Sequence, residues 1–249
     1  MKLNYLKQKN FKMSFKIASP EKNIEYRLLT EDKLESALEV QQKSMYYENV
    51  AKGVGIYEEE GAAEVMKVIF REVVKDNCTI VAIDTNTDQV VGVSFNKLHV
   101  PIATDVSNIF NEVVNNHVKQ RSALALIQFL DDIESKVNLF ERYNTQAAME
   151  IFYVGTDPDY CGRRIGHGIV SASLELARGL QRYQNNPDQI VPGVAFGVFT
   201  SNYSQKIAES FHFEWLETVW YSDCEYWGKT MAERIGDEHK TAKLGALHL

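Results

Sequence analysis

The sequence contains little cysteine, little proline and no long apolar run. Of its 249 residues, 3 are Cys and 5 are Pro. Cys78, Cys161 and Cys224 are odd in number and far apart, which excludes a disulfide framework and favours a reducing compartment, so we expect a cytoplasmic protein. No apolar segment approaches the roughly 20 residues that span a bilayer, and the basic N-terminus lacks the apolar core of a secretory signal. We therefore expect no membrane partner.

Clusters of basic residues are also missing. The chain has 27 Lys and Arg against 34 Asp and Glu, which gives a net charge of -7. A nucleic-acid-binding face normally carries clustered Lys and Arg, so we expect no nucleic-acid partner. The balance suits a cationic ligand, although an acidic surface also promotes solubility. The 6 histidines form no pair at metal-ligand spacing, so the sequence predicts no metal site.

The residues that are present alternate between strand and helix patterns. Apolar runs bounded by polar turns predict strands at residues 24–30, 78–84, 89–99, 148–157, 194–201 and 214–227. Helical spacing of apolar residues predicts helices after Thr30 and at 58–77, 105–117, 122–139, about 165–183 and 203–211.

This order predicts one α/β domain, with a mixed central sheet of about six to seven strands flanked by helices. An early hairpin and late strand–helix–strand units support this interpretation. We expect residues 1–22 to form a flexible extension, 23–230 the folded domain, and 231–249 a C-terminal tail or final strand.

The stretch "VGTDPDYCGRRIGHGIVSASLELARGL", from Val154 to Leu180, passes from a strand through a glycine-containing turn into a helix. A helix N-terminus offers free backbone N–H groups and a partial positive charge, so it binds anions readily. Glycine there permits a close approach and positive φ angles. Neither the Walker A spacing nor the dinucleotide G-x-G-x-x-G spacing is present. Two interpretations remain open: an anion site, or glycines that only shape the turn.

Two motifs resemble those of the GNAT superfamily of acetyl-CoA-dependent N-acetyltransferases. "DPDYCGRRIGHGIV" resembles its motif A, and "SNYSQKIAESFHF" resembles its last helix, which ends in Gly-Phe. More narrowly, "YYENVAKG", "NCTIVAIDTNTDQVVGVSFNKLHVP", "ALIQFLDDIESKVNLFERY" and "TSNYS" resemble the insect arylalkylamine (dopamine) N-acetyltransferases. The resemblance covers about residues 24–230 and implies a single-domain GNAT fold.

The resemblance implies that acetyl-CoA binds where the helix begins. In the family register, Cys161 stands at a Gln or Arg position, Arg164 at the first Gly, and Gly166 at the final small residue. Backbone N–H groups do most of the binding in such loops, and an arginine adds charge beside a pyrophosphate. A cysteine there could also be a nucleophile, but its motif position is by the pyrophosphate. The implied cofactor-binding residues are Tyr153, Val154, Cys161, Gly162, Arg163, Arg164, Ile165, Gly166, His167, Gly168 and Asn202.

Acetyl transfer to an amine needs a base for the ammonium proton, donors for the developing oxyanion, and a proton for the thiolate. The resemblance implies Glu48 as the general base and backbone N–H groups near Tyr153–Val154 as the oxyanion donors. It implies the hydroxyls of Thr200 and Ser204 for the thiolate and the proton relay. The tyrosine that many GNAT enzymes use for this last step falls at Ala208, so it is unavailable.

The catalytic candidates also have plain structural interpretations. Glu48 could be a solvated acid at the end of the first helix. Ser204 could hydrogen-bond the backbone in the first turn of its helix. Thr200 keeps the hydroxyl that a serine supplies in the family, with one more methyl group. Tyr47 and Tyr203 are the implied substrate-binding residues.

The resemblance implies acetylation of a small primary amine by direct attack in a ternary complex. We also expect a monomer. Arylalkylamines such as dopamine, tyramine, serotonin or tryptamine are the first expectation, and aliphatic polyamines or agmatine are the alternative. A catalytically weak acyl-CoA-binding protein and a protein N-acetyltransferase are further alternatives.

Overall fold

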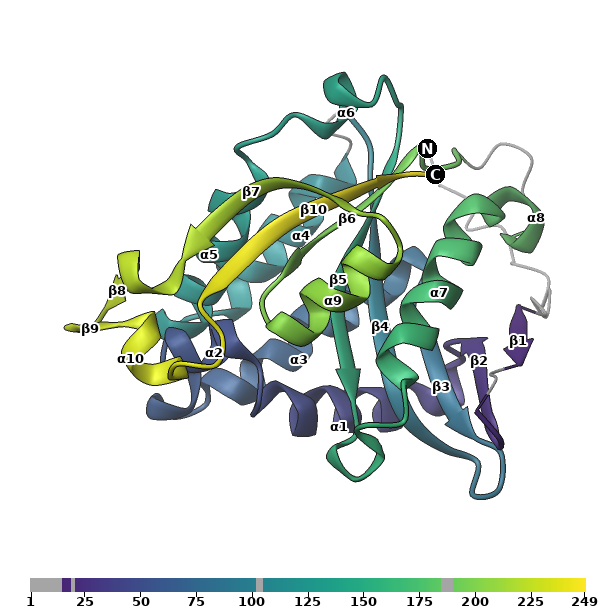
Figure 1. Cartoon of the computed structure of the whole chain (residues 1–249), viewed down its shortest axis with the longest axis horizontal. Coiled ribbons are helices and arrows are strands. Elements are labelled where there is room, and N and C mark those ends of the chain that lie inside the picture. Colours follow the sequence, from purple (N-terminus) through teal and green to yellow (C-terminus); the bar gives the residue numbers. More distant parts are fainter. Residues whose placement is uncertain (1–14, 19–20, 102–104, 185–189) are drawn as a thin grey trace, which may run out of the picture.

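The structure is a computed structural model that describes residues 15–18, 21–101, 105–184 and 190–249. Within these residues an eight-stranded sheet has the order β1-β2-β3-β4-β5-β6-β10-β7, with helices on both faces (Figure 1). The expected α/β fold with a mixed central sheet is confirmed. The sheet has more strands than predicted because β1 (Lys16–Ala18) and β10 (Thr241–His248), near the two ends of the chain, join it.

The other elements follow the predicted order closely. The remaining strands are β2 (Ile24–Leu28), β3 (Ile80–Asp84), β4 (Gln89–His99), β5 (Ala148–Thr156), β6 (Val194–Phe199) and β7 (Glu214–Trp220), with a separate pair formed by β8 (Glu225–Tyr226) and β9 (Lys229–Thr230). The helices are α1 (Leu34–Met45), α2 (Asn49–Gly53), α3 (Ala62–Val73), α4 (Asp105–His117), α5 (Arg121–Glu134), α6 (Leu139–Arg142), α7 (Ile165–Arg178), α8 (Leu180–Gln184), α9 (Asn202–Ser210) and α10 (Met231–Ile235).

The central strands β5 and β6 pair over only part of their length. They run parallel, and their register extends from Ala148 opposite Val194 to Glu150 opposite Phe196. Beyond that point β6 continues to Phe199 with β10 as its antiparallel partner. β5 continues beside β4, with a register shift that marks a bulge. The two strands therefore diverge, and backbone groups on the β6 side of β5 lose their strand partner there.

Two apolar cores lie on opposite faces of the sheet. In Figure 1, α7 and α9 lie in front of the sheet and α3 and α4 behind it. The rear core includes Met66 and Phe70 of α3, packed with Phe95 of β4. The front core includes Ile165 and Ile169 of α7. All five of these side chains are almost fully buried, so each face of the sheet has its own tightly packed layer.

Several predicted boundaries differ from the structure. The predicted helix 122–139 ends at Glu134, and the separate helix α6 begins at Leu139. The predicted helix 165–183 is interrupted at Gly179, because glycine is a poor helix former. Thr30 makes no side-chain cap. The predicted strand 214–227 ends at Trp220, where a short 3-10 turn begins.

Segments near both ends of the chain contribute strands to the sheet. Within the predicted extension 1–22, β1 pairs antiparallel with β2, while residues 1–14 and 19–20 lie outside the described residues. Within the predicted segment 231–249, β10 is a long strand inserted between β6 and β7. Of the two alternatives expected for 231–249, a tail or a final strand, the described residues contain the strand. No helix in the described part of the chain is long and apolar enough to cross a bilayer.

Candidate active site

A cavity of about 310 Å³ lies where β5 and β6 diverge. Its walls include Gly166 and Ile207, from helices on the front face, and Phe70, from α3 on the rear face. Val154 of β5 and Val198 of β6 line it between the two layers. Residues of both helix layers therefore line one cavity at the point where the two strands separate.

Glu48 lies in this cavity wall, but not at the end of the first helix. α1 ends at Met45, and Glu48 is the extended N-cap residue of α2. Its carboxylate accepts hydrogen bonds from the backbone N–H groups of Val50 at 3.0 Å and Ala51 at 2.6 Å. These bonds satisfy donors that a helix N-terminus leaves free. The side chain is half-buried and fixed by its own helix.

Thr200 makes direct contact with Glu48. Its Oγ1 donates a hydrogen bond to Oε1 of Glu48 at 2.7 Å. The Thr200 carbonyl accepts from Nδ2 of Asn49 at 2.8 Å and from the Tyr221 hydroxyl at 2.6 Å. Two candidate catalytic residues separated by 152 positions in sequence are thus joined in one hydrogen-bond network.

Tyrosines surround the Glu48 carboxylate. Burial and the nearby Glu48 charge raise the pKa of Tyr57 to about 12. Burial and the Glu48 charge also raise the pKa of Tyr153 and of Tyr221. All three phenols are therefore neutral at physiological pH.

Ser204 lines the same cavity but hydrogen-bonds within its own helix turn. Its Oγ accepts from the backbone N–H of Ser201 at 3.1 Å, and the Ser201 hydroxyl accepts from the backbone N–H of Ser204 at 3.0 Å. This is a reciprocal capping box at the start of α9. The capping interpretation of Ser204 is therefore observed, and no direct hydrogen bond joins it to Glu48 or Thr200 among the described contacts.

The start of α7 has free backbone donors. In the part of the chain that the structure describes, the N–H groups of residues 162–167 have no hydrogen-bond acceptor. Gly162 has φ 79° and Arg164 has φ 57°, so both residues adopt the left-handed conformation. Cys161, Arg163 and Arg164 are exposed. A set of free amides at a helix N-terminus, beside two arginines, is suited to phosphate groups.

Other predicted cofactor residues are engaged in packing. A Cβ at Gly168 would overlap the Tyr26 ring, so this glycine is needed for packing against β2. The Ile165 side chain belongs to the front core. The His167 ring lies 4.6 Å from that of Phe211. Neither the Ile165 nor the His167 side chain lines the cavity; that of Ile165 is buried, and that of His167 is half-buried.

The remaining predicted residues divide between the cavity and the surface. Tyr203 lines the cavity, and its hydroxyl donates to Glu238. Tyr47 is exposed, contacts the Tyr46 ring and does not line the cavity. Asn202 donates its backbone N–H to His239 and its side-chain amide to the Glu238 carbonyl. Tyr47 and Asn202 thus lie apart from the cavity walls.

The cysteine at the loop is not an activated nucleophile. Although Cys161 is exposed as a residue, partial burial of its thiol, together with the charge of Asp157, raises the pKa of Cys161. The thiol therefore stays protonated near neutral pH, which disfavours a thiolate role.

The sequence reasoning missed a charged floor at the rear of the cavity. Its members are Lys97 and His99 of β4, Asp131 and Glu134 of α5, and Glu150 of β5. His99 Nε2 lies 2.7 Å from Oε2 of Glu150, and Glu150 is buried. Burial and the charges of Glu150 and Asp131 raise the pKa of Glu134 well above its ordinary value. We call these five residues the charged floor.

One signal in the sequence could have indicated the charged floor. Glu150 is the single charged residue within the apolar strand "AMEIFYV", and a buried charge needs a partner. Its partners come from another strand and a helix, which a single sequence does not bring together. Among the described residues, no group of three His, Cys, Asp or Glu side chains is arranged as metal ligands.

Comparison with models of protein families and with the sequences of curated proteins finds no match. Solved structures do match, and they give this chain the GNAT acetyltransferase fold, as the sequence predicted. Arylalkylamine N-acetyltransferase 2 from Aedes aegypti has a TM-score of 0.73 and 20% identity, over 91% of this chain and 99% of that chain.

Two related enzymes match over similar lengths. An agmatine N-acetyltransferase has a TM-score of 0.71 and 16% identity, over 91% of this chain and 100% of its own. Drosophila melanogaster polyamine N-acetyltransferase, which forms N-acetylagmatine, has a TM-score of 0.67 and 18% identity, also over 91% of this chain and 100% of its own. The structure thus resembles insect arylalkylamine N-acetyltransferases and acetyltransferases of aliphatic amines alike.

Proposed function

We propose that this protein is an acetyl-CoA-dependent N-acetyltransferase that acetylates a small primary amine by direct attack in a ternary complex. The observation that carries the proposal is the cavity where β5 and β6 separate. Its walls include Gly166 at the first turn of α7 and Glu48 with Thr200. One reactant can therefore enter beside the free amides of α7, and the other can enter from the rear face.

The residues at the start of α7 suit the pyrophosphate of acetyl-CoA. The free N–H groups of residues 162–167 would donate to phosphate oxygens. The guanidinium of Arg164 is exposed beside them, and that of Arg163 lies 4.5 Å from the Tyr160 ring. When bound, acetyl-CoA supplies an activated acetyl group. Gly166 has no side chain, so it leaves room in the cavity wall for the pantetheine arm of the coenzyme.

Glu48 removes the proton that keeps the amine unreactive. An alkyl ammonium group has a pKa of about 10.4, so a base must deprotonate it near neutral pH. The Glu48 carboxylate faces the cavity, and Thr200 holds one of its oxygens. Once neutral, the amine nitrogen forms a bond to the acetyl carbon, and the carbon–sulfur bond breaks.

Two further groups would complete the transfer. Where β5 leaves β6, backbone N–H groups near Tyr153–Val154 supply donors for the acetyl oxygen as charge develops. The hydroxyls of Thr200 and Ser204 lie in the cavity wall and can pass a proton to the departing thiolate. Position 208, where many GNAT enzymes carry the tyrosine for this step, is a buried alanine here, so no side chain at that position protonates the thiolate.

The amine side of the cavity has walls that suit an arylalkylamine. Phe70, Phe110 and Phe152 line it, and aromatic rings pack well against a flat apolar body. A hydroxylated arylalkylamine would place polar groups towards the charged floor. This geometry supports an arylalkylamine as the first substrate class.

The charged floor also favours a second candidate class, the aliphatic diamines and agmatine. Glu150 lies four residues before Val154 on β5, a span of about 13 Å at strand rise. A second ammonium or guanidinium group at the far end of an extended diamine could reach the carboxylates from the reacting position. Such a cation would find Asp131 and Glu150 as partners.

The test is acetyl-CoA consumption by the purified chain with a panel of amines. Tyramine and tryptamine represent the arylalkylamines, agmatine and putrescine the diamines, and a histone-tail peptide the protein substrates. We expect turnover with at least one small amine, none with the peptide, and heat from coenzyme A binding in calorimetry. Coenzyme A heat without turnover would indicate a binding protein instead. No heat at millimolar coenzyme A would refute the proposal.

A further inference from the structure

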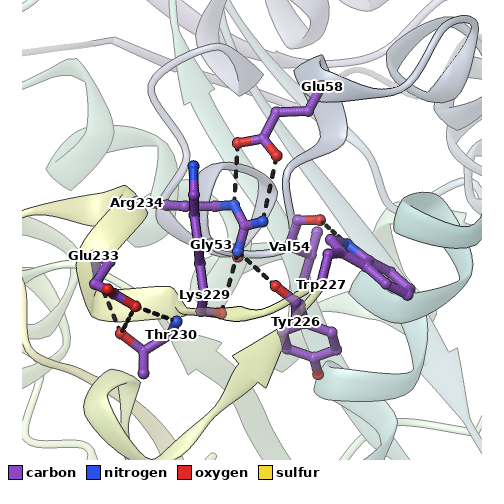
Figure 2. Close-up of polar contacts among 9 residues, drawn as sticks. All are labelled: Gly53, Val54, Glu58, Tyr226, Trp227, Lys229, Thr230, Glu233 and Arg234. Atoms are coloured by element: carbon purple, nitrogen blue, oxygen red, sulfur yellow. Dashed lines mark hydrogen bonds and ion pairs between the residues drawn. The ribbon is translucent and has the colours of Figure 1, made fainter.

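Residues 227–234, which follow β8, contact the C-terminal end of α2, the helix that Glu48 caps. Arg234 of α10 has only 6% of its side chain exposed. Its Nε and Nη2 donate to the two carboxylate oxygens of Glu58, at 3.0 and 3.3 Å; Glu58 ends the short 3-10 helix Ile56–Glu58 that follows α2. Its Nη1 donates to the carbonyls of Tyr226 at 2.8 Å, Lys229 at 3.3 Å and Gly53 at 3.4 Å. Figure 2 shows these bonds converging on one guanidinium.

Two neighbouring contacts hold the same end of α2. The Trp227 indole donates to the carbonyl of Val54, the residue after the helix, at 2.9 Å (Figure 2). A Cβ at Gly53 would overlap the Met231 side chain, so α2 and α10 are in close contact. We call the segment from Tyr226 to Arg234, which makes these contacts, the C-terminal clasp.

The N-terminal end of α2 holds the proposed general base, Glu48, and its hydrogen-bond partners. Glu48 caps the first turn, Asn49 donates to the Thr200 carbonyl, and Thr200 donates to Glu48. α2 has only 5 residues, and helices this short have no stability of their own. Its orientation is therefore set by what holds its two ends. About 7.5 Å of helix separates Glu48 from Gly53, so a tilt at the clasp moves the carboxylate.

We propose that Arg234 is a positioning residue, which holds Glu48 at the acetyl-transfer site by fixing the C-terminal end of α2. Arg234 does not line the cavity, so it acts through the helix and not on the substrate. The inference rests on the proposed function, in which Glu48 is the general base. An arginine suits position 234 because its planar guanidinium donates to a carboxylate and to three carbonyls at once.

The test compares Arg234→Ala, Arg234→Lys and the wild type with the best amine of the panel, between pH 7 and pH 10. We expect Arg234→Ala to lower kcat at pH 7 about 10-fold, because small displacements of a catalytic group carry large penalties. The deficit should narrow towards pH 10, where more amine is already neutral. Coenzyme A affinity should stay within a factor of about two, because the α7 loop is untouched. Arg234→Lys should recover only part of the rate.

Two controls separate positioning from lost stability. Arg71→Ala removes a matched, exposed pair between Arg71 and Glu35, and it should leave kcat unchanged. Leu180→Ala opens the fully buried front core, away from α2, and it should lower the melting temperature without the pH-dependent kcat deficit. If Arg234→Ala does not fold, Glu58→Gln weakens the same clasp and leaves the three carbonyl acceptors in place.

The decisive measurement is Arg234→Ala in a Glu48→Ala background. If the C-terminal clasp acts through Glu48, adding Arg234→Ala to the Glu48→Ala variant should change kcat by less than about twofold. An equal loss in both backgrounds, or a loss that appears in KM alone, would overturn the inference. Absence of turnover in the wild type would instead refute the proposed function. If Arg234→Ala lowers kcat while Glu48→Ala leaves kcat unchanged, both the base role of Glu48 and the positioning role of Arg234 are refuted.

Discussion

Replacing Glu48 tests the proposed chemistry most directly. At pH 7, only roughly one molecule in 2,500 of an amine with pKa ~10.4 is neutral. A positioned base typically contributes 10²–10⁴-fold in rate, which is the size of effect needed to offset that fraction. We therefore expect Glu48→Ala to lower kcat/KM about 10²-fold or more at pH 7. At pH 10, where roughly a third of the amine is neutral, the deficit should shrink to about 10-fold or less.

The structure also predicts how three replacements of Glu48 should differ. Glu48 accepts hydrogen bonds from Val50 and Ala51 as an N-cap, and its loss as a cap costs about 0.5–2 kcal/mol. Glu48→Ala removes both cap and base. Glu48→Gln keeps a carbonyl oxygen for the cap but removes the base. Glu48→Asp keeps charge and cap but withdraws the carboxylate by one methylene.

The assay is initial-rate acetylation between pH 6.5 and pH 10, with thermal unfolding measured in parallel. Glu48→Gln should match the wild-type melting temperature more closely than Glu48→Ala does, yet show the same pH-dependent loss of rate. Glu209→Gln, a change at an exposed glutamate on α9, is the matched control and should be neutral. A rate loss that is flat across pH in both Ala and Gln variants would remove Glu48 from the base role.

Three further predictions address the cofactor loop, the charged floor and the clasp. Gly168→Ala should destabilise the fold by about 1–3 kcal/mol, because the new methyl overlaps Tyr26, while the folded fraction binds coenzyme A as before in calorimetry. Asp131→Asn should lower kcat/KM for agmatine relative to tyramine by about 10-fold if a second cation reaches Asp131 in the charged floor; an unchanged ratio would exclude that contact. Hydrogen bonding to Arg234 lowers the pKa of Glu58 below its ordinary 4.5, so the pair stabilises the fold above pH 4.5 and this stability is lost as pH falls through the lowered value. Denaturant unfolding should therefore show the wild type and Glu58→Gln converging in stability at acid pH; a constant difference would contradict the assignment.

The parts of the site that sequence reasoning anticipated are those encoded locally. The β5–α7 turn combines an apolar strand, a turn with glycine and arginine, and a helix within one short stretch, and the structure places free amides there. The resemblance also pointed to Glu48 and Thr200, which the structure joins by a hydrogen bond. Whether these residues bind acetyl-CoA and catalyse transfer stays a prediction.

The parts that sequence reasoning missed depend on distant segments. Glu150 joins His99 from another strand and Glu134 from a helix, and only the folded chain brings these polar residues to one cavity. Gly168 looked like a ligand-binding glycine, yet its neighbour is Tyr26 of β2. A glycine required for close packing and one required for phosphate look the same in a single sequence.

The last strand, β10, supports β6 where β6 separates from β5 beside the cavity. β6 leaves β5 after Phe196, and a strand that separates from its neighbour normally exposes unpaired backbone groups. β10 pairs with β6 from Val194 to Phe199, across the whole of that strand. The part of β6 that has left β5 therefore keeps a partner on its other side. The segment expected as a tail or final strand thus lets the central sheet open without an unsupported strand, and the cavity lies between the two helix layers, with Glu48 and Gly166 in its walls.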